Sequence, residues 1–342
     1  MPASRVCLLH VGGTLGMVHT ADGLRPQPGL LLDYLARMPE LHSGDVPEAQ
    51  LEVLAPLLDS ADMGPRDWIR IAQAIVARAS EFDGFVVLHG TDTMAHTASA
   101  LSFLLPGLTK PVVLTGSQLS LTHPRSDGRE HILTSLILAG TQAIPEVCIY
   151  FGSRLLRGNR AQKINSADFV AFDSGNLPPL ATVGTNIVVQ RHLVRSPGQG
   201  LPESIDFVRA PNVAALRVFP GLTADVLAAV LAPDTDGLVL ETYGAGTFPE
   251  SQTQLLDVLR EVMARQPAPV IVSCSQCHGG AVREHVYRSS RTLAGLGVVS
   301  GHDMTPEATL TKLYCLLATG TPPEEARARM GQNIAGELTP VH

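Results

Sequence analysis

The stretch Gly84-Phe85-Val86-Val87-Leu88-His89-Gly90-Thr91-Asp92-Thr93-Met94 decides the fold class of this chain. Residues 84–88 are apolar, with β-branched side chains and no polar alternation, which is typical of a strand buried on both faces of a parallel sheet. Residues 93–105 then predict a helix. In open α/β sheets, ligands bind beyond the carboxyl ends of the strands, where a strand passes into the next helix. The polar residues 91–93 therefore mark a candidate functional site.

A second junction of this kind lies near the N-terminus, where the apolar residues 6–9 run into His10-Val11-Gly12-Gly13-Thr14-Leu15-Gly16-Met17. Adjacent glycines allow the backbone to turn sharply and to approach a ligand closely. A plain turn between a strand and a helix, or a nucleotide-binding turn, would explain the glycines as well. The spacing matches neither the G-x-G-x-x-G fingerprint nor the P-loop, which disfavours a nucleotide-binding protein.

Strand-like and helix-like segments alternate along the whole chain, which predicts βαβ units and parallel sheets. In the first half, strands are expected at 6–9, 51–57, 85–88, 112–115 and 147–151, and helices at 29–37, 65–79, 93–105 and 128–139. In the second half, strands are expected at 213–218, 237–240, 270–274 and around Val298, and helices at 223–232, 249–265, 305–318 and 323–334.

The strongest break in this pattern is the segment Ser196-Pro197-Gly198-Gln199-Gly200-Leu201-Pro202, which is rich in residues that interrupt regular structure. A chain of 342 residues with 45% apolar content can bury two sizeable cores. We therefore expect an N-terminal domain over 1–190, a linker over 191–212 and a C-terminal domain over 213–342.

The composition excludes several classes of function. The formal charge is −7 and only 4% of residues are aromatic, which disfavours a nucleic-acid partner. No stretch approaches 18 uninterrupted apolar residues, and the N-terminus shows no leader pattern, so we expect no membrane association and a cytoplasmic location.

The five cysteines, an odd number, favour reduced thiols over a disulfide framework. Cys274-Ser275-Gln276-Cys277-His278 contains a CxxC pair. Metal or redox chemistry is disfavoured there because a zinc site needs three or four ligands and the chain has no second such pair. We expect no metal.

The two glycine- and threonine-containing motifs, taken together, resemble the L-asparaginase family, most closely its bacterial cytoplasmic type I branch. Five further segments also resemble the family pattern, so that the likeness covers essentially the whole chain: Asp59-Ser60-Ala61-Asp62-Met63, residues 114–118 with Arg125-Ser126-Asp127-Gly128, Arg157-Gly158-Asn159-Arg160-Ala161-Gln162-Lys163, residues 303–313, and Gly336-Glu337-Leu338. The resemblance implies an α/β fold with a larger, flavodoxin-like N-terminal domain of mostly parallel sheet and a smaller C-terminal domain with a Rossmann-like parallel sheet. It further implies hydrolysis of L-asparagine to L-aspartate and ammonia without a cofactor, in a homodimer or homotetramer.

Amide hydrolysis needs a nucleophile, a proton carrier and donors for the developing oxyanion. By the resemblance, Thr14 is the nucleophile that forms an acyl-enzyme, and Thr91, Asp92 and Lys163 form a hydrogen-bonded triad that activates the nucleophile or the water. The resemblance also assigns substrate binding to Asp59, Ser60, Thr91 and Asp92. A free amino acid presents an ammonium and a carboxylate that both need partners once water is excluded. Asp92 suits the ammonium, and Ser60 with nearby backbone N–H groups suits the carboxylate.

Other polar residues near these motifs have more than one interpretation. Asp62 is better explained as the N-cap of the helix that begins near Pro65 than as a ligand contact. Ser126 and Asp127 either cap the next helix or support the pocket, and His89 is a supporting residue at most.

The chain departs from the family pattern at several positions. Val11 replaces a threonine, and Leu24 stands where the family commonly carries a mobile tyrosine near the nucleophile. Glu241 and Gln162 replace residues of an effector site found in some type I enzymes, and Thr247 replaces an asparagine. These departures leave open another small amide, such as glutamine or D-asparagine, as the substrate. A binding or regulatory protein on the same scaffold is a third alternative.

Overall fold

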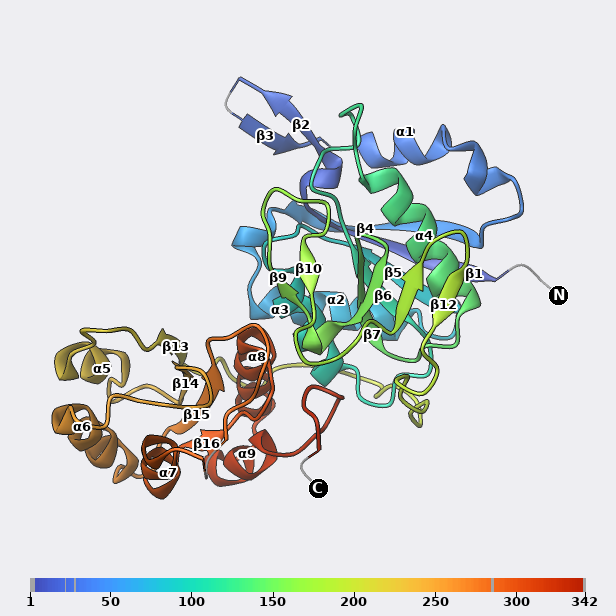
Figure 1. The fold of residues 1–342 in the computed structure, drawn as a ribbon. Helices are drawn as coiled ribbons and strands as arrows, with labels where there is room; N and C mark the ends of the chain where they lie inside the picture. Colours follow the sequence, from blue (N-terminus) through green and yellow to red (C-terminus); the bar gives the residue numbers. More distant parts are fainter. Residues whose placement is uncertain (1–3, 22, 28, 284–285, 341–342) are drawn as a thin grey trace. The chain divides into compact units, whose positions relative to one another are not determined.

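The computed structural model describes residues 4–21, 23–27, 29–283 and 286–340 (Figure 1). The chain divides into two compact units, the first formed by Met1–Ser174 with Pro178–Ile205 and the second by Gly175–Leu177 with Asp206–His342. The first unit extends into the expected linker because Gly198 and Gly200 donate backbone hydrogen bonds to the carbonyls of Leu108 and Gly107. Asp22, two residues before Leu24, lies outside the described residues.

The first unit is built on an eight-stranded sheet with the strand order β12-β11-β8-β7-β6-β5-β1-β4. Its parallel part consists of β4 (Glu48–Leu58), β1 (Arg5–Gly12), β5 (Gly84–Leu88), β6 (Val112–Thr115) and β7 (Val147–Phe151). Antiparallel strands β8 (Arg154–Arg157), β11 (Ala181–Val183) and β12 (Ile187–Val189) complete one edge. Every residue of β5, β6 and β7 is buried, as their uninterrupted apolar sequences predict.

The helices of the first unit are α1 (Leu30–Ala36), α2 (Pro65–Ala77), α3 (Met94–Leu104) and α4 (Gly128–Thr141). Helix α2 begins differently from the prediction. Its N-cap is Gly64, whose N–H donates to the Asp67 carboxylate at 3.0 Å, and Pro65 occupies the first turn. Asp62 instead ends the short 3₁₀ turn η3 (Ser60–Asp62), so the expectation that Asp62 is the N-cap was wrong.

Two small antiparallel hairpins of the first unit were not expected. β2 (Met17–Thr20) pairs with β3 (Gly23–Pro26), and β9 (Gln162–Lys163) pairs with β10 (Phe172–Asp173). The 3₁₀ turns η1 (Thr14–Gly16), η2 (Pro39–His42) and η4 (Gly158–Arg160) complete this unit. Strands of two to four residues carry too little hydrophobic pattern to be recognised in a sequence.

The second unit has a four-stranded parallel sheet in the order β13-β14-β15-β16, formed by Val213–Arg217, Gly237–Thr242, Val270–Ser275 and Val299–Ser300. Its helices are α5 (Ala224–Val230), α6 (Thr253–Met263), α7 (Arg288–Gly295), α8 (Pro306–Ala318) and α9 (Pro323–Met330). One hydrophobic cluster joins the sheet to α5, α6 and α7, and a second joins it to α8 and α9. The two-domain α/β fold class is thus confirmed.

Candidate active site

Three strand ends of the first unit meet at the glycines of the N-terminal motif. Gly13 donates its N–H to the carbonyl of Leu58 at the end of β4, at 3.1 Å. A Cβ atom on Gly13, whose φ is 94°, would lie 2.4 Å from the backbone nitrogen of Gly90. No side chain fits there, so the backbone after β1 packs directly on the backbone after β5. Thr14 and Thr91, which follow these two glycines, are thereby brought close together.

Thr14 opens the 3₁₀ turn η1 and is partly exposed. Met17 closes this turn by donating its N–H to the Thr14 carbonyl. Leu121, in the loop after β6, donates to the Leu15 carbonyl at 3.3 Å and fixes the turn from outside. Across the described parts of the chain, the Thr14 hydroxyl forms no hydrogen bond with another side chain.

Thr91, Asp92 and Lys163 form a hydrogen-bonded cluster, as the family pattern implies. Lys163 Nζ donates to Thr91 Oγ1 at 2.8 Å and to Asp92 Oδ1 at 2.6 Å. Thr91 is buried, the Lys163 side chain is 19% exposed and the Asp92 side chain is 64% exposed. The cluster therefore has an inner hydroxyl and an outer carboxylate that a ligand can reach.

Lys163 reaches the cluster from the hairpin formed by β9 and β10. Phe172 is its partner in the strand register, and Ile164 donates its N–H to the Ala171 carbonyl at 2.8 Å. The sequence alone indicated a lysine on a polar segment but not this hairpin. The local sequence does not predict the hairpin, because β9 and β10 have only two residues each.

Asp59 and Ser60 lie at the end of β4, beside the motif after β5. The Asp59 carboxylate accepts a hydrogen bond from Ala61 N at 3.0 Å, so it stabilises its own turn. Ser60 is 2% exposed, and a Cβ atom on Gly90 would lie 2.4 Å from its hydroxyl oxygen. Thr93 Oγ1 donates to the Ser60 carbonyl at 2.7 Å. The two loops are thus joined, with the Ser60 hydroxyl directly against Gly90.

His89 and His10 are buried at the ends of β5 and β1. His89 Nδ1 lies 2.7 Å from the Gly90 carbonyl oxygen and its Nε2 lies 2.9 Å from Thr97 Oγ1. A carbonyl only accepts, so Nδ1 carries a proton. Burial lowers the pKa of each histidine from 6.5 to about 4. His89 therefore supports the site as a neutral residue.

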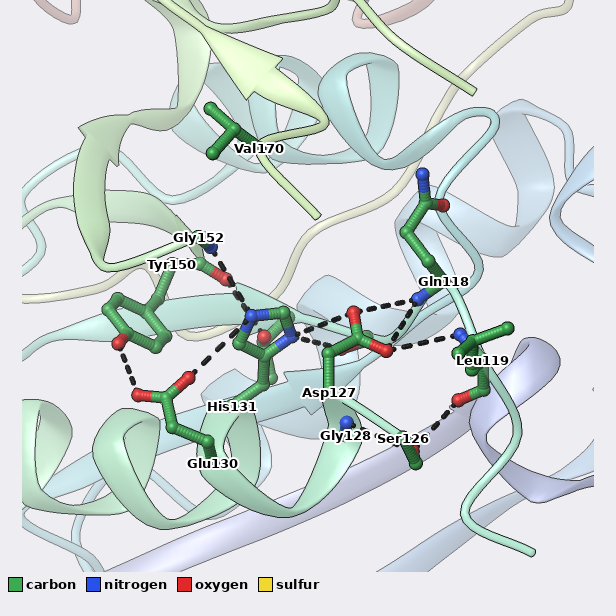
Figure 2. Close-up of polar contacts among 12 residues, drawn as sticks. Gln118, Leu119, Ser126, Asp127, Gly128, Glu130, His131, Tyr150, Gly152 and Val170 are labelled. Atoms are coloured by element: carbon green, nitrogen blue, oxygen red, sulfur yellow. Dashed lines mark hydrogen bonds and ion pairs between the residues drawn. The ribbon is translucent and has the colours of Figure 1, made fainter. Parts of the chain in front are cut away.

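Asp127 and Ser126 stabilise the loop after β6, as Figure 2 shows. The Asp127 carboxylate accepts from Gln118 N, at 3.1 and 2.9 Å, and from Leu119 N at 3.1 Å. Ser126 Oγ accepts from Gly128 N at 3.1 Å, at the start of α4. Asp127 occupies the N-cap position of α4 without a side-chain cap hydrogen bond, and its carboxylate instead organises the neighbouring loop.

Two of the residues that depart from the family pattern, Glu241 and Thr247, form polar contacts within the second unit. Glu241 pairs with Arg217 at 3.3 Å, and Thr247 Oγ1 donates to the Tyr243 carbonyl at 3.4 Å. Val11 is buried in β1. Leu24 lies in β3, but its side chain is outside the described structure.

Within the described ranges, no group of three or more His, Cys, Asp or Glu side chains is arranged to hold a metal ion. Cys274 is buried and Cys277 is exposed, and both are free thiols. Among the helices that the structure describes, none is long and apolar enough to span a membrane.

The chain is similar to known proteins over its whole length. Residues 5–195 match the family model "Asparaginase, N-terminal", and residues 212–330 match "Glutaminase/Asparaginase C-terminal domain". L-asparaginase 1 of Escherichia coli is 42% identical over 342 residues, which cover 99% of each chain. The crystal structure of L-asparaginase I from Vibrio cholerae aligns with a TM-score of 0.89 and 38% identity, over 98% of this chain and 99% of that one. A glutamyl-tRNA(Gln) amidotransferase subunit of Thermococcus kodakarensis is 32% identical, over 98% of this chain and 76% of its own length.

The fold and these matches define the protein as an amidohydrolase. It belongs to the asparaginase family and, within it, to the bacterial type I branch.

Proposed function

We propose that this protein hydrolyses L-asparagine to L-aspartate and ammonia, with Thr14 as the nucleophile. One observation carries the proposal. Lys163 Nζ lies 2.8 Å from Thr91 Oγ1 and 2.6 Å from Asp92 Oδ1, beside the glycine contact that precedes Thr14. This arrangement supplies a nucleophile, a proton carrier and a charged pair within one loop cluster.

In the first half of the proposed reaction, Thr14 Oγ1 adds to the carbonyl carbon of the side-chain amide. The C–N bond breaks as the amide nitrogen takes up the proton that the Thr14 hydroxyl loses, so ammonia leaves and an ester to Thr14 remains. In the second half, water adds to that ester, the bond to Thr14 breaks, and the hydroxyl regains its proton. The products are aspartate and free enzyme.

The Thr91–Asp92–Lys163 cluster moves the protons in this scheme. Because Thr91 Oγ1 accepts from Lys163, its own O–H points toward a third partner, which is the reacting amide or the attacking water. Asp92 fixes the lysine amine and, through its exposed side, also attracts the substrate ammonium. Ser60 and adjacent N–H groups are the proposed partners of the substrate carboxylate, with Asp59 holding their turn in place.

A second candidate is the same reaction on another small amide, such as glutamine or D-asparagine. Leu24 and Thr247 favour it, because Leu24 removes the phenol expected from the family pattern and Thr247 changes one polar contact expected near the substrate. The similarity to an amidotransferase subunit points the same way, since relatives of this fold serve more than one substrate. We also expect a homodimer or homotetramer and a cytoplasmic location, which gel filtration with light scattering and cell fractionation test.

Ammonia release from L-asparagine, D-asparagine and L-glutamine tests the proposal. We expect wild type to be most active on L-asparagine, and Thr14→Ala and Thr91→Val each to lose at least about 100-fold, the scale of nucleophilic or acid-base assistance. Thr242→Val is the matched control, because this buried hydroxyl lies in the second unit and donates to the Cys274 carbonyl. Near wild-type turnover by Thr14→Ala would refute the assigned nucleophile, and a higher rate on glutamine would favour the second candidate.

A further inference from the structure

His131 joins the carboxyl ends of two strands next to the candidate site. It lies in the first turn of α4 and is 2% exposed. Its Nδ1 lies 2.9 Å from the Gly116 carbonyl oxygen after β6, and Gly152 N after β7 donates to its Nε2 at 3.2 Å. A carbonyl only accepts and a backbone N–H only donates, so Nδ1 donates to Gly116 and Nε2 accepts from Gly152. Figure 2 shows the ring between Asp127 on one side and Glu130 on the other.

Gly152 in turn supports the segment that connects β9 to β10. Its φ is 54°, and a Cβ atom there would lie 2.9 Å from the carbonyl oxygen of Phe169 and 3.2 Å from Val170 Cα. The connecting segment therefore packs directly on the Gly152 backbone. A shift of Gly152 would be transmitted to the hairpin that carries Lys163.

A second contact reaches the same connecting segment from the loop after β6. The Asp127 carboxylate holds Gln118 and Leu119 through their backbone N–H groups. The Gln118 side chain then donates from Nε2 to the Asp168 carbonyl at 2.9 Å. Asp127 and His131, four residues apart on the same helix end, thus support the hairpin by two separate routes.

An aromatic row forms a third route to Lys163. The His131 ring packs on Phe151, with centroids 4.3 Å apart, and Phe151 packs on Phe172 at 5.2 Å. Phe172 is the register partner of Lys163 across the hairpin. The three routes converge on two short strands that have little stability of their own.

We propose that His131 and Asp127 are positioning residues for Lys163. They fix the position of the β9–β10 hairpin, so that the lysine amine lies within hydrogen-bond distance of Thr91 and Asp92. This inference rests on the proposed function, in which Lys163 serves the reaction. A displacement of a catalytic group by about 1 Å can cost about 100-fold in rate, so a small relaxation of the hairpin is enough to lower turnover.

Three variants test the positioning role through kinetics. His131→Phe keeps a ring against Phe151 but loses both hydrogen bonds, and Gln118→Met keeps the chain length but loses the donor to Asp168. Thr141→Val is the control, because this hydroxyl at the C-terminal end of the same helix donates to the Ile137 carbonyl. We expect His131→Phe to lower kcat about 10- to 100-fold and Gln118→Met about 3- to 10-fold, with KM unchanged and the control at the wild-type rate.

NMR signals of the lysine side chains give a readout that does not depend on activity. The chain has only three lysines, Lys110, Lys163 and Lys312, so ¹³C-labelled lysine gives three Cε signals that Lys→Arg substitutions assign. In folded His131→Phe and Gln118→Met we expect the Lys163 signal to shift or split, while the other two stay in place. Thr141→Val should move none of them.

An unmoved Lys163 signal in both variants, or a moved signal with unchanged kcat, overturns the positioning role. An equal loss in kcat and substrate affinity also overturns it, because that points to general disruption of the site. If His131→Phe does not fold, Gln118→Met decides alone. The proposed function would be refuted by a different result, namely full turnover by Lys163→Met. That result is independent of the lysine signals measured in His131→Phe and Gln118→Met.

Discussion

Lys163 and Lys312 each contact a carboxylate at 2.6 Å, yet their surroundings differ completely. The side chains of Lys312 and its partner Glu337 are fully buried. The pair of Lys163 with Asp92 faces solvent through an aspartate that is 64% exposed. The other acceptors of the two amines differ as well. Lys163 also donates to a threonine hydroxyl, whereas Lys312 also donates to the backbone carbonyls of Met330 and Gln332.

Both members of the Lys312–Glu337 pair form further hydrogen bonds with the backbone. The Glu337 carboxylate accepts from the backbone N–H groups of Ile334 and Ala335, and burial lowers the pKa of Lys312. Every one of these partners lies at the end of α9 or in the segment that follows it, so the pair fastens that segment to α8. A buried pair whose lysine also donates to backbone carbonyls is structural. A pair that faces solvent and donates to a side-chain hydroxyl is available for chemistry.

Removing the amine of Lys163 should have the largest effect on turnover. We expect Lys163→Met to lower kcat by about 100- to 10,000-fold, because the proton carrier and the partner of Thr91 are both lost. Substrate affinity, measured by calorimetry, should stay largely intact, and the unfolding midpoint should hardly change because Asp92 is already solvated. If affinity fell as far as turnover, Lys163 would belong with the structural lysines.

Removing the negative charge of Glu337 should have the opposite profile. Glu337→Gln leaves the Lys312 ammonium buried without a counter-charge, which costs about 3–5 kcal/mol of stability. Urea unfolding measures this loss, with Asp257→Asn as control because its pair with Arg260 is exposed and contributes less than about 1 kcal/mol. Equal midpoints for the two variants would show that burial does not distinguish the pairs.

Acid pH should weaken the first unit through its buried histidines. His10 and His89 have a pKa near 4 in the folded protein and 6.5 as the reference value, so the unfolded chain binds protons more readily between these values. Their contribution is fully present above pH 6.5 and is lost as the pH falls toward 4, by about 2 kcal/mol for each histidine at pH 5. Urea unfolding at pH 7 and pH 5 checks this expectation. Unchanged stability over that interval would contradict neutral burial of the two rings.

The sequence predicted those parts of the fold and the site that depend on local pattern. The run 84–88 and the helix after it were recognised because apolar periodicity is a short-range property. Helix α7 was missed because it is largely polar, with only Ser290 and Leu293 buried. The role of Asp62 was misread because the capping carboxylate comes from Asp67, inside the helix.

Long-range contacts could not be predicted from the residues alone. Lys163 reaches Thr91 across 72 positions of the chain, and His131 is joined to Gly116 and Gly152, which lie 15 and 21 positions away. Only the folded sheet brings these segments together. The motif resemblance indicated which residues belong to the site, and the structure supplies the hairpin and the supporting contacts that hold them.

The smallest effect is expected at the third lysine, Lys110, which has backbone partners like Lys312 but is only partly buried. Its Nζ donates to the carbonyls of Ala79 and Phe82, at 2.6 and 2.5 Å, just beyond the C-terminal end of α2. A cation there also interacts favourably with the helix dipole. Lys110→Met keeps the apolar stem and loses both hydrogen bonds, so we expect a loss of about 1–2 kcal/mol in urea unfolding and no change in ammonia release. If turnover fell as in Lys163→Met, the set of partners around a lysine amine would not identify the lysine that serves the reaction.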